Sequence, residues 1–452
     1  MKKTAAVILA AGQGTRMHSA LPKVLHPLNG KPMLWHVMQP ALDAGSEKPV
    51  VIIGNGADQV KDAIGEEAAY YAIQTEQLGT GHATQQAEAS LKGNVDQVLV
   101  MYGDMPCWRV ETLRQIIATQ AANSGPMTMA TIIVDDPRGF GRVERDAQGK
   151  VLAIVEEAQC TDAQKKIQEL NVGLYCFEAD WLWEALRRIK LSPKGEYYLT
   201  DTVQLAVQDG GQVLAIPIDD PDEAIGVNTR VHLSEAEAVL RKRINHALME
   251  SGVSMMNPEH TYIEAGVRIG KDTILRPGTW IKGDTVIGEG CDIGPNTIIT
   301  DSQVGNHTTI LSSVLDKAII EDHVEIGPFA RLRPGAHLAD HVHMGNFGEV
   351  KNSYLAEGVK MGHFSYIGDT QVGKDVNIGC GTITCNYDGK HKNKTIIGDN
   401  TFIGSGTMLV APLKIGSGSY TGAGSVVTHD VEDKTVVVGV PARKLREVKD
   451  SD

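Results

Sequence analysis

The stretch IGKDTILRPGTWIKGDTVIGEGCDIGPNTII, residues 269–299, carries an apolar residue at every sixth position. An α-helix turns once every 3.6 residues, so a period of six cannot keep one helical face apolar. A three-sided coil can, because each unit of six residues makes one flat face with its apolar side chain inside. Eighteen residues then complete one turn of a parallel β-helix. The apolar residues of the series are Ile269, Leu275, Ile281, Ile287, Ile293 and Ile299.

An apolar residue followed by glycine often starts the unit, and such pairs recur as far as residues 415–416. We expect the glycine to permit the corner between two faces. The phase of the repeat breaks at residues 384–396, TCNYDGKHKNKTI, which predicts a loop projecting from one edge of the coil. The basic run KHKNK at 390–394 is either a solvated surface or a contact for a phosphate of substrate or cofactor.

The length and composition of the chain limit what kind of protein it is. A chain of 452 residues predicts two or three domains, and 42% apolar with 22% charged residues is typical of a soluble globular protein. A net charge of -13 argues against binding to nucleic acid. It leaves open a local basic pocket for an anionic substrate.

The cysteines and the N-terminal segment indicate a cytoplasmic protein. The six cysteines are scattered without metal-ligand spacing, which favours reduced thiols over a disulfide framework. We find no segment with the ~18 apolar residues needed to cross a membrane. The opening MKKTAAVILAAG breaks quickly into glycine-rich sequence, so a buried first strand fits it better than a signal peptide.

The chain changes character near residue 230. Before that point, short apolar runs alternate with longer helical patterns, which predicts a parallel sheet with helices on both faces. The predicted strands include 5–10, 50–53 and 97–101, and the predicted helices include 32–44 and 81–91. Residues 231–251 contain no Gly or Pro and predict one long connecting helix. We therefore expect an α/β domain at 1–228, a helical linker at 229–252 and an all-β coil at 253–452.

A glycine-rich motif, LAAGQGTRM at residues 9–17, directly follows the first predicted strand. Its small residues let backbone N–H groups approach a nucleotide, while Arg16 and Lys23 add positive charge for a pyrophosphate. The third glycine of the dinucleotide-binding motif is absent. By itself the Gly-x-Gly pair fits a tight strand-to-helix turn equally well, and the full run with PKVLH at 22–26 favours the nucleotide site.

These residues resemble the signature of the sugar-1-phosphate nucleotidyltransferases. QLGTGHA at 77–83 resembles the uridylyltransferase branch, and GDMP at 103–106 is similar to the strand end whose aspartate holds Mg²⁺. The resemblance implies a Rossmann-like domain in which Asp104 and Asn228 bind Mg²⁺ while Arg16 and Lys23 act in catalysis. The substrate-binding residues that it implies are Leu9, Ala10, Ala11, Gly12, Lys23, Gln74, Gly79, Thr80, Tyr102, Gly103, Asp104, Gly141, Glu156, Asn171 and Asn228.

The chemistry of such a site is simple. A sugar-1-phosphate oxygen attacks the α-phosphorus of UTP and pyrophosphate leaves, so catalysis is positioning and neutralisation of charge. Mg²⁺ prefers hard oxygen ligands and keeps several waters, so one carboxylate and one amide oxygen suffice. Two assignments have structural alternatives. Asp104 also fits a helix N-cap or turn, and Glu156 also fits a solvated charge beside Glu157.

Three segments in the back half resemble the bifunctional glucosamine-1-phosphate acetyltransferase and N-acetylglucosamine-1-phosphate uridylyltransferase family. They are 330–335 with 345–347 and 351–352, then 362–369, and 377–389. With the front half, the resemblance covers about residues 5–443. It implies a left-handed β-helix in which His363 is the base that deprotonates the substrate amine. The substrate-binding residues that it implies here are Arg333, Lys351, Tyr366, Asn377 and Lys392. Acetyl-CoA contacts are implied at Cys380, Asn386, Tyr387, Ser405, Ala423 and Arg443.

The family resemblance implies acetyl transfer from acetyl-CoA to glucosamine-1-phosphate, followed by uridylyl transfer from UTP to N-acetylglucosamine-1-phosphate. It also implies a homotrimer, and a product that feeds peptidoglycan and lipopolysaccharide synthesis. Cys380 departs from the family pattern, which commonly has Ala there, and Arg443 lies in a tail that resembles simpler hexapeptide acyltransferases. Two other hypotheses remain: a nucleotidyltransferase whose β-helix only assembles it, and a non-catalytic sugar-nucleotide sensor.

Overall fold

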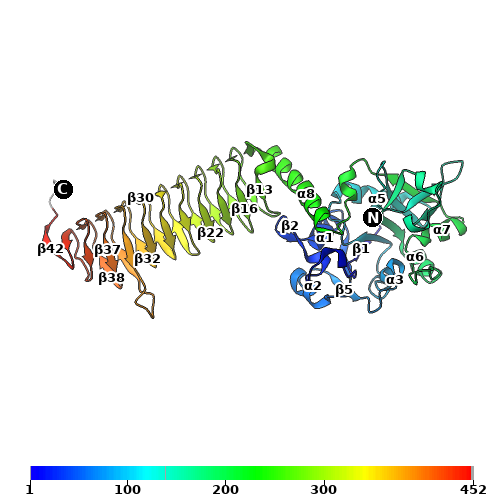
Figure 1. Ribbon diagram of the computed structural model, residues 1–452, viewed down its shortest axis with the longest axis horizontal. Helices are drawn as coiled ribbons and strands as arrows, with labels where there is room; N and C mark the ends of the chain where they lie inside the picture. Colours follow the sequence, from blue (N-terminus) through cyan, green and yellow to red (C-terminus); the bar gives the residue numbers. More distant parts are fainter. Residues whose placement is uncertain (1, 138, 449–452) are drawn as a thin grey trace. The chain divides into compact units, whose positions relative to one another are not determined.

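The computed structural model describes residues 2–137 and 139–448. The chain divides into two compact units, Met1–Leu240 and Arg241–Asp452, which are described separately below. Helix α8, Arg230–Glu250, runs across this division and confirms the single long helix predicted there (Figure 1). Within the described residues, no helix is both long enough and apolar enough to cross a membrane.

The first unit is built on a nine-stranded sheet with its main strands in the order β11-β7-β10-β6-β1-β4-β5. Strand β1 lies parallel between β4 and β6, as the alternation of strands and helices predicts. The strands of this path are β1 (Thr4–Leu9), β4 (Glu47–Ile53), β5 (Tyr70–Ile73), β6 (Gln97–Tyr102), β7 (Met127–Ile133), β10 (Glu169–Glu178) and β11 (Val213–Pro217). A separate small hairpin joins β2 (Pro27–Leu28) to β3 (Lys31–Pro32).

The prediction of a parallel sheet is wrong at β10. This strand lies between β6 and β7 and runs antiparallel to both. It follows a hairpin of β8 (Arg142–Arg145) and β9 (Val151–Val155) rather than a helical crossover. A crossover helix is what returns the chain in the parallel direction, so its absence here allows the antiparallel strand.

Helices cover both faces of this sheet. Ala5 and Val7 of β1 pack in one core cluster with Leu182, while Ala6 and Ile8 pack in the other. The single helix predicted at 81–91 is broken into two short helices. The helices of the unit before α8 are α1 (Met33–Asp43), α2 (Ala57–Ile64), α3 (Thr80–Gln85), α4 (Glu88–Leu91), α5 (Val110–Ala122), α6 (Ala179–Leu186) and α7 (Asp201–Gln208).

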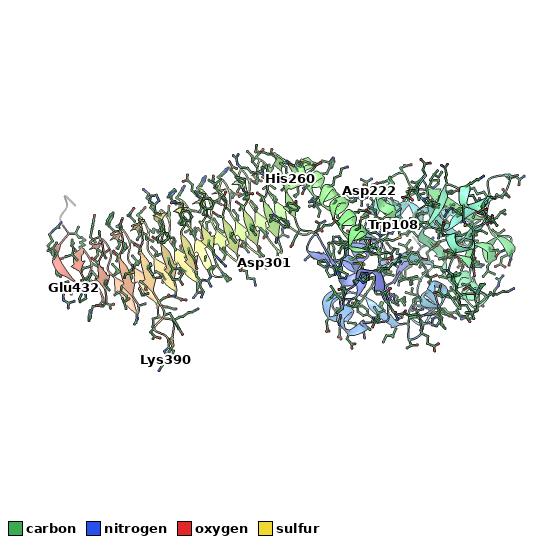
Figure 2. The ribbon with its side chains drawn as sticks, viewed as in Figure 1. Trp108, Asp222, His260, Asp301, Lys390 and Glu432 are labelled. Atoms are coloured by element: carbon green, nitrogen blue, oxygen red, sulfur yellow. The ribbon has the colours of Figure 1, made fainter. Side chains whose placement is uncertain are left out.

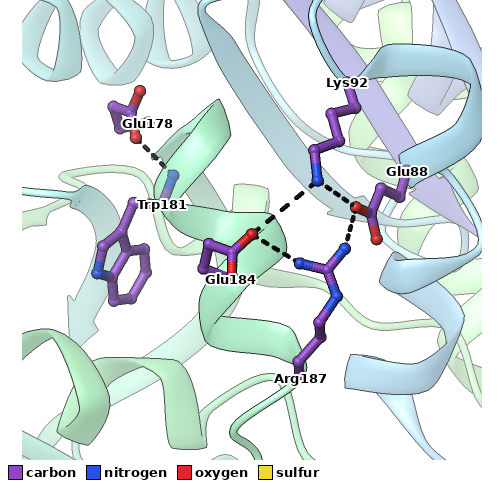
Figure 3. A network of polar contacts seen from close by, with 6 residues as sticks. All are labelled: Glu88, Lys92, Glu178, Trp181, Glu184 and Arg187. Atoms are coloured by element: carbon purple, nitrogen blue, oxygen red, sulfur yellow. Dashed lines mark hydrogen bonds and ion pairs between the residues drawn. The ribbon is translucent and has the colours of Figure 1, made fainter.

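Helices α4 and α6 are also joined at their surface by a network of ion pairs (Figure 3). The Arg187 guanidinium binds both Glu88 and Glu184, at 2.7 Å from the latter, and Lys92 lies 2.9 Å from Glu88. Exposed pairs of this kind contribute little to stability individually. Burial of Leu182 and its apolar neighbours therefore positions α6, and the network only ties its outer edge.

The second unit is a coil of short strands stacked into three parallel sheets, one for each side (Figure 1). The first sheet holds β12 (Ser254–Met255), β15 (Ile274–Leu275), β18 (Asp292–Ile293), β21 (Thr309–Ile310), β24 (Glu325–Ile326), β27 (His343–Asn346), β30 (Lys360–His363), β33 (Asn377–Ile378), β36 (Phe402–Ile403), β39 (Tyr420–Thr421), β41 (Thr435–Gly439) and the antiparallel β42 (Ala442–Glu447).

The second sheet holds β13 (Tyr262–Ile263), β16 (Trp280–Lys282), β19 (Ile298–Thr300), β22 (Val314–Asp316), β25 (Arg331–Leu332), β28 (Glu349–Lys351), β31 (Tyr366–Gly368), β34 (Ile383–Cys385), β37 (Met408–Val410) and β40 (Val426–Val427). The third holds β14 (Arg268–Ile269), β17 (Val286–Ile287), β20 (Gln303–Val304), β23 (Ile319–Ile320), β26 (Ala336–Leu338), β29 (Ser353–Leu355), β32 (Thr370–Val372), β35 (Thr395–Ile397) and β38 (Leu413–Ile415). This arrangement confirms the predicted β-helix.

The length of a coil varies along the stack. Ile274 pairs with Asp292 eighteen residues later, as predicted, but Asp292 pairs with Thr309 after seventeen and Thr309 with Glu325 after sixteen. The step from Asn377 to the next coil is longer, at twenty-five residues. The extra residues form the loop predicted from the break in phase, and Lys390 lies at its projecting tip (Figure 2).

Some glycines that follow the apolar positions, such as Gly270 and Gly288, serve close packing of the backbone rather than the corners, whereas Gly294 and Gly327 do have positive φ angles. A Cβ added to Gly270 would lie 2.7 Å from the backbone of Gly288 in the next coil, and one on Gly288 would lie 2.7 Å from the carbonyl oxygen of Gly305. Many corners are instead formed by residues such as Asp272 and His307, which adopt positive φ angles. The predicted role as corner residues is therefore wrong at Gly270 and Gly288, because neither has the positive φ of a corner.

Candidate functional sites

The carboxyl ends of β1 and β6 form the floor of a pocket in the first unit. Leu9 and Tyr102 are paired across these parallel strands, so the loops that follow them emerge side by side. The pocket has a volume of about 310 Å³. Ten predicted residues line it: Leu9, Ala10, Ala11, Gly12, Lys23, Gln74, Gly79, Thr80, Tyr102 and Asp104.

One edge of this pocket is a cluster of two cations and two oxygen donors. Lys23 Nζ lies 2.5 Å from Asp104 Oδ2 and donates to Asn228 Oδ1 at 3.2 Å. Arg16 Nη2 donates to the same amide oxygen at 2.9 Å. The backbone N–H of Val227 donates to the Asp104 carbonyl at 2.8 Å and holds the two segments together.

The donor set of this cluster fits Mg²⁺. Asp104 Oδ2 and Asn228 Oδ1 both bind the Lys23 ammonium, so a carboxylate and an amide oxygen converge on one small volume. Mg²⁺ is commonly held by one or two protein oxygens, with waters and substrate phosphates completing its coordination. Among the described residues, no group of three or more His, Cys, Asp or Glu side chains has metal-binding geometry.

The opposite side of the pocket rests on buried hydrogen bonds. Tyr102 interacts with Thr80 and with Tyr175, and burial, followed by the charge of Glu156, raises the pKa of its hydroxyl. Asn171 Nδ2 donates to Tyr175 Oη at 2.7 Å. The predicted residues Tyr102, Thr80 and Asn171 therefore share one network. At its centre lies Tyr175, which was not predicted from the sequence.

Other predicted residues lie near this network. Glu156 Oε1 accepts a hydrogen bond from Thr200 Oγ1 at 2.9 Å, so Glu156 is held in place rather than freely solvated. A Cβ on Gly141 would lie 3.8 Å from the Cα of Glu156, and one on Gly103 would lie 3.1 Å from the Leu9 carbonyl oxygen. A Cβ on Gly141 would also lie 2.9 Å from Cγ2 of Ile154, so a side chain at either glycine would require its neighbours to shift.

Several residues of this site were not predicted from the sequence. Gln77, Glu196 and Tyr198 line the pocket, and Gln77 Nε2 donates to the Ala11 carbonyl at 2.8 Å. Gln77 lies in the uridylyltransferase motif, which was the available signal for it. Tyr175 gave no such signal, because it lies within the buried run of β10 and its contact with Tyr102 depends on strand pairing.

The second candidate site surrounds His363 at the end of β30. His363 pairs with Asn346 of the preceding coil, and its Nδ1 lies 2.9 Å from Asn346 Oδ1. Asn377 lies on the following coil, in register with Lys360. The sequence predicts His363 and Asn377 in this site but does not select Asn346, which stands seventeen residues before the histidine.

Predicted cations gather on an adjacent face. Lys351 contacts Lys392 of the projecting loop, and this second ammonium, together with Arg333, lowers the pKa of Lys351. Arg333 Nη1 donates to Glu349 Oε1 at 2.9 Å, and Glu349 is paired with Tyr366. Two lysines held this close together favour an anion between them.

The predicted acetyl-CoA contacts form a column along three further coils. The N–H of Gly406 donates to the Cys380 carbonyl at 2.7 Å, and the N–H of Gly424 donates to the Ser405 carbonyl at 2.8 Å. Cys380, Ser405 and Ala423 thus occupy corresponding positions in successive coils, and the Cys380 side chain is exposed. This column is continuous with the His363 corner, since the Gly381 N–H donates to the Phe364 carbonyl at 2.7 Å.

The remaining predicted contacts are more dispersed. Asn386 Nδ2 donates to Asp369 at the base of the projecting loop, and Tyr387 lies exposed with its hydroxyl bound to the Gly389 carbonyl. Arg443 lies on β42 and lines a separate pocket of about 500 Å³ with residues of the last coils. In the described hydrogen bonds its guanidinium donates to the adjacent Ala442 carbonyl, so it is not brought into the column.

Comparison with known proteins agrees with this two-site arrangement. The nucleotidyl transferase family model matches residues 5–222, and the bacterial transferase hexapeptide model matches residues 394–429. The bifunctional protein GlmU of Heliobacterium modesticaldum is 46% identical, covering 99% of this chain and 98% of its own length. The same protein of Geobacillus sp. (strain WCH70) is 47% identical with 97% and 95% covered, and that of Enterococcus faecalis is 44% identical with 92% and 91% covered. A chain this similar over its whole length belongs to the family of bifunctional GlmU proteins.

Proposed function

We propose that this chain carries out the last two steps in the synthesis of UDP-N-acetylglucosamine. The second unit acetylates glucosamine-1-phosphate with acetyl-CoA, and the first unit joins the product to UMP from UTP with release of pyrophosphate. The observation that carries the proposal is the match to bifunctional relatives over 99% of the chain, which includes both candidate sites. The product serves cell-wall synthesis.

In the uridylyl transfer, the sugar-1-phosphate oxygen bonds to the α-phosphorus of UTP, and the bond to the pyrophosphate oxygen breaks. Lys23 and Arg16 stand at the pocket edge, where they neutralise the charge of the departing pyrophosphate. Asp104 and Asn228 would hold Mg²⁺, which adds positive charge to the phosphates when bound. The wall of Tyr102, Thr80 and neighbouring residues orients the substrates for in-line attack.

In the acetyl transfer, the amine nitrogen of glucosamine-1-phosphate bonds to the acetyl carbon while the thioester C–S bond breaks. His363 takes the proton that the amine loses, and the thiolate of CoA takes a proton in turn. Lys351, Lys392 and Arg333 supply the charge that binds the substrate phosphate. Backbone groups of the Cys380 column bind acetyl-CoA.

We also propose a homotrimer with acetyl-transfer sites between neighbouring β-helices. The outward column on one sheet of the coil is apolar and exposed, with Trp280 40%, Ile298 37% and Val314 41% accessible. A flat apolar column is suited to packing against another flat face. We place the enzyme in the cytoplasm, where an exposed thiol such as Cys380 stays reduced.

A substrate-omission assay with two matched variants tests the proposal. The purified chain is incubated with glucosamine-1-phosphate, acetyl-CoA, UTP and Mg²⁺, leaving out one at a time, and thiol and pyrophosphate release are followed separately. Thiol release should not need UTP, whereas pyrophosphate release should need both acetyl-CoA and Mg²⁺. Asp104→Asn should abolish only pyrophosphate release. His363→Ala should abolish thiol release, and with it pyrophosphate release, which should return when N-acetylglucosamine-1-phosphate is supplied.

The alternative of a β-helix that only assembles the enzyme gives a different outcome. The wild-type chain would then release pyrophosphate from UTP and supplied N-acetylglucosamine-1-phosphate but would release no thiol from acetyl-CoA. A folded His363→Ala variant with full acetyl transfer would show instead that the activity is present but that His363 is not its base. Gel filtration with light scattering measures the assembly, and a monomer would contradict the proposed trimer.

A further inference from the structure

The His363 corner is attached to Asn346 by two hydrogen bonds. The side-chain bond joins His363 Nδ1 to Asn346 Oδ1 at 2.9 Å, and the backbone N–H of Phe364 donates to the Asn346 carbonyl at 2.9 Å. Both residues end strands that are paired in register, β27 and β30. The side chain of Asn346 therefore approaches the imidazole from the neighbouring coil, while the main chain fixes the distance between the coils.

An amide oxygen only accepts hydrogen bonds, so the proton of a neutral His363 ring must reside on Nδ1. The other ring nitrogen, Nε2, then carries the lone pair and is the atom able to take a proton. We propose that Asn346 is a positioning residue that sets the tautomer and direction of the His363 ring, leaving Nε2 free to accept the proton of the substrate amine. This inference rests on the proposed function of His363.

The chemical nature of Asn346 matters beyond its shape. A neutral amide orients the ring without adding a negative charge, whereas a carboxylate at 2.9 Å would stabilise the protonated imidazolium. His343 and Lys360 lie on the same two strands, β27 and β30, and Cys380 lies at the corresponding position of the next coil. These neighbours stay the same in an Asn346→Asp variant, so any change in pH dependence comes from the new carboxylate.

The test compares three variants in the full chain. Asn346→Ala should lower kcat for acetyl transfer by on the order of 10- to 100-fold, a typical effect of losing a hydrogen bond that orients a functional histidine. The KM for acetyl-CoA should change little, because the Cys380 column is untouched. Asn346→Asp should recover part of kcat, and the acid limb of its pH profile should move to higher pH.

Asn306→Ala is the matched control. Asn306 also makes hydrogen bonds across coils, accepting from the Glu289 N–H at 2.9 Å and donating to Asp322, but it makes no contact with His363. It should leave acetyl transfer unchanged. Uridylyl transfer by the first unit gives the enzyme concentration in every sample, and thermal unfolding followed by circular dichroism checks that the second unit is folded.

Nitrogen NMR of the His363 ring gives a readout independent of activity. Wild type should show a single neutral tautomer protonated at Nδ1, and Asn346→Ala should show a mixture. The inference would be overturned if both Asn346 variants had the kcat, the pH profile and the ring signals of the wild type. The role of His363 would then be unaffected. Full acetyl transfer by His363→Ala would overturn both, so the two failures are distinguishable.

Discussion

Gly173 offers a direct test of how the first unit shapes its pocket. It lies in β10, where the pairing with β7 is irregular, and has a φ of 73°. A Cβ added there would lie 2.0 Å from Cε2 of Tyr102, far inside contact distance. Since Tyr102 lines the pocket, Gly173→Ala must either move the tyrosine ring or shift the strand.

The size of the effect follows from two contributions. An alanine at positive φ costs about 1–2 kcal/mol, and displacing a packed ring costs about a further 1–3 kcal/mol. Gly149 is the matched control, because its φ is 79° but a Cβ there would meet nothing within 4 Å. Gly149→Ala should therefore lower the free energy of unfolding by the first contribution alone. Gly173→Ala should lower it by about 2–5 kcal/mol in all.

Urea unfolding followed by circular dichroism measures these free energies, and steady-state kinetics measures the two activities. Gly173→Ala should lose uridylyl transfer through the displaced Tyr102 ring, while acetyl transfer by the second unit is retained. Gly149→Ala should keep both activities. If Gly173→Ala matched Gly149→Ala in both stability and uridylyl transfer, the proposed coupling between Gly173 and Tyr102 would be refuted.

Three further predictions address other parts of the molecule. Leu332→Ala, in the core of the coil, should destabilise the second unit by about 2–5 kcal/mol without lowering uridylyl transfer; a loss of both activities in thermal unfolding and kinetic assays would contradict this. The hydrogen bonds from Arg188 lower the pKa of Asp209 to about 2, so this carboxylate favours folding above pH 4 and the benefit is lost as the pH falls toward 2. Asp209→Asn should flatten the acid limb of the stability curve, and an unchanged limb would argue against the pair. Lys23→Met removes the ammonium held by the two oxygen donors, so it should bind Mn²⁺ more tightly than wild type without nucleotide, by electron paramagnetic resonance, yet lose uridylyl transfer by more than about 100-fold.

The sequence predicts parts of the candidate sites because motif residues are adjacent in the chain. Leu9, Gly12 and Lys23 reach one pocket because they follow a single strand closely. Tyr175 was not predicted, and Asn346 was recognised only as part of the segment 345–347 with no role assigned, because each acts through a partner on another strand. A contact of that kind depends on which strands pair and in what register.

The period of six by itself determined the coil, because an apolar residue at every sixth position can be buried only in a three-sided stack. The period did not determine the register between coils. Some coils are one or two residues shorter than eighteen, because a corner can lose residues without changing which side chains point inward. The partner of His363 therefore stands seventeen residues earlier rather than eighteen. Only the tertiary structure decided that partner, since cross-coil hydrogen bonds rather than local periodicity fix which side chains meet.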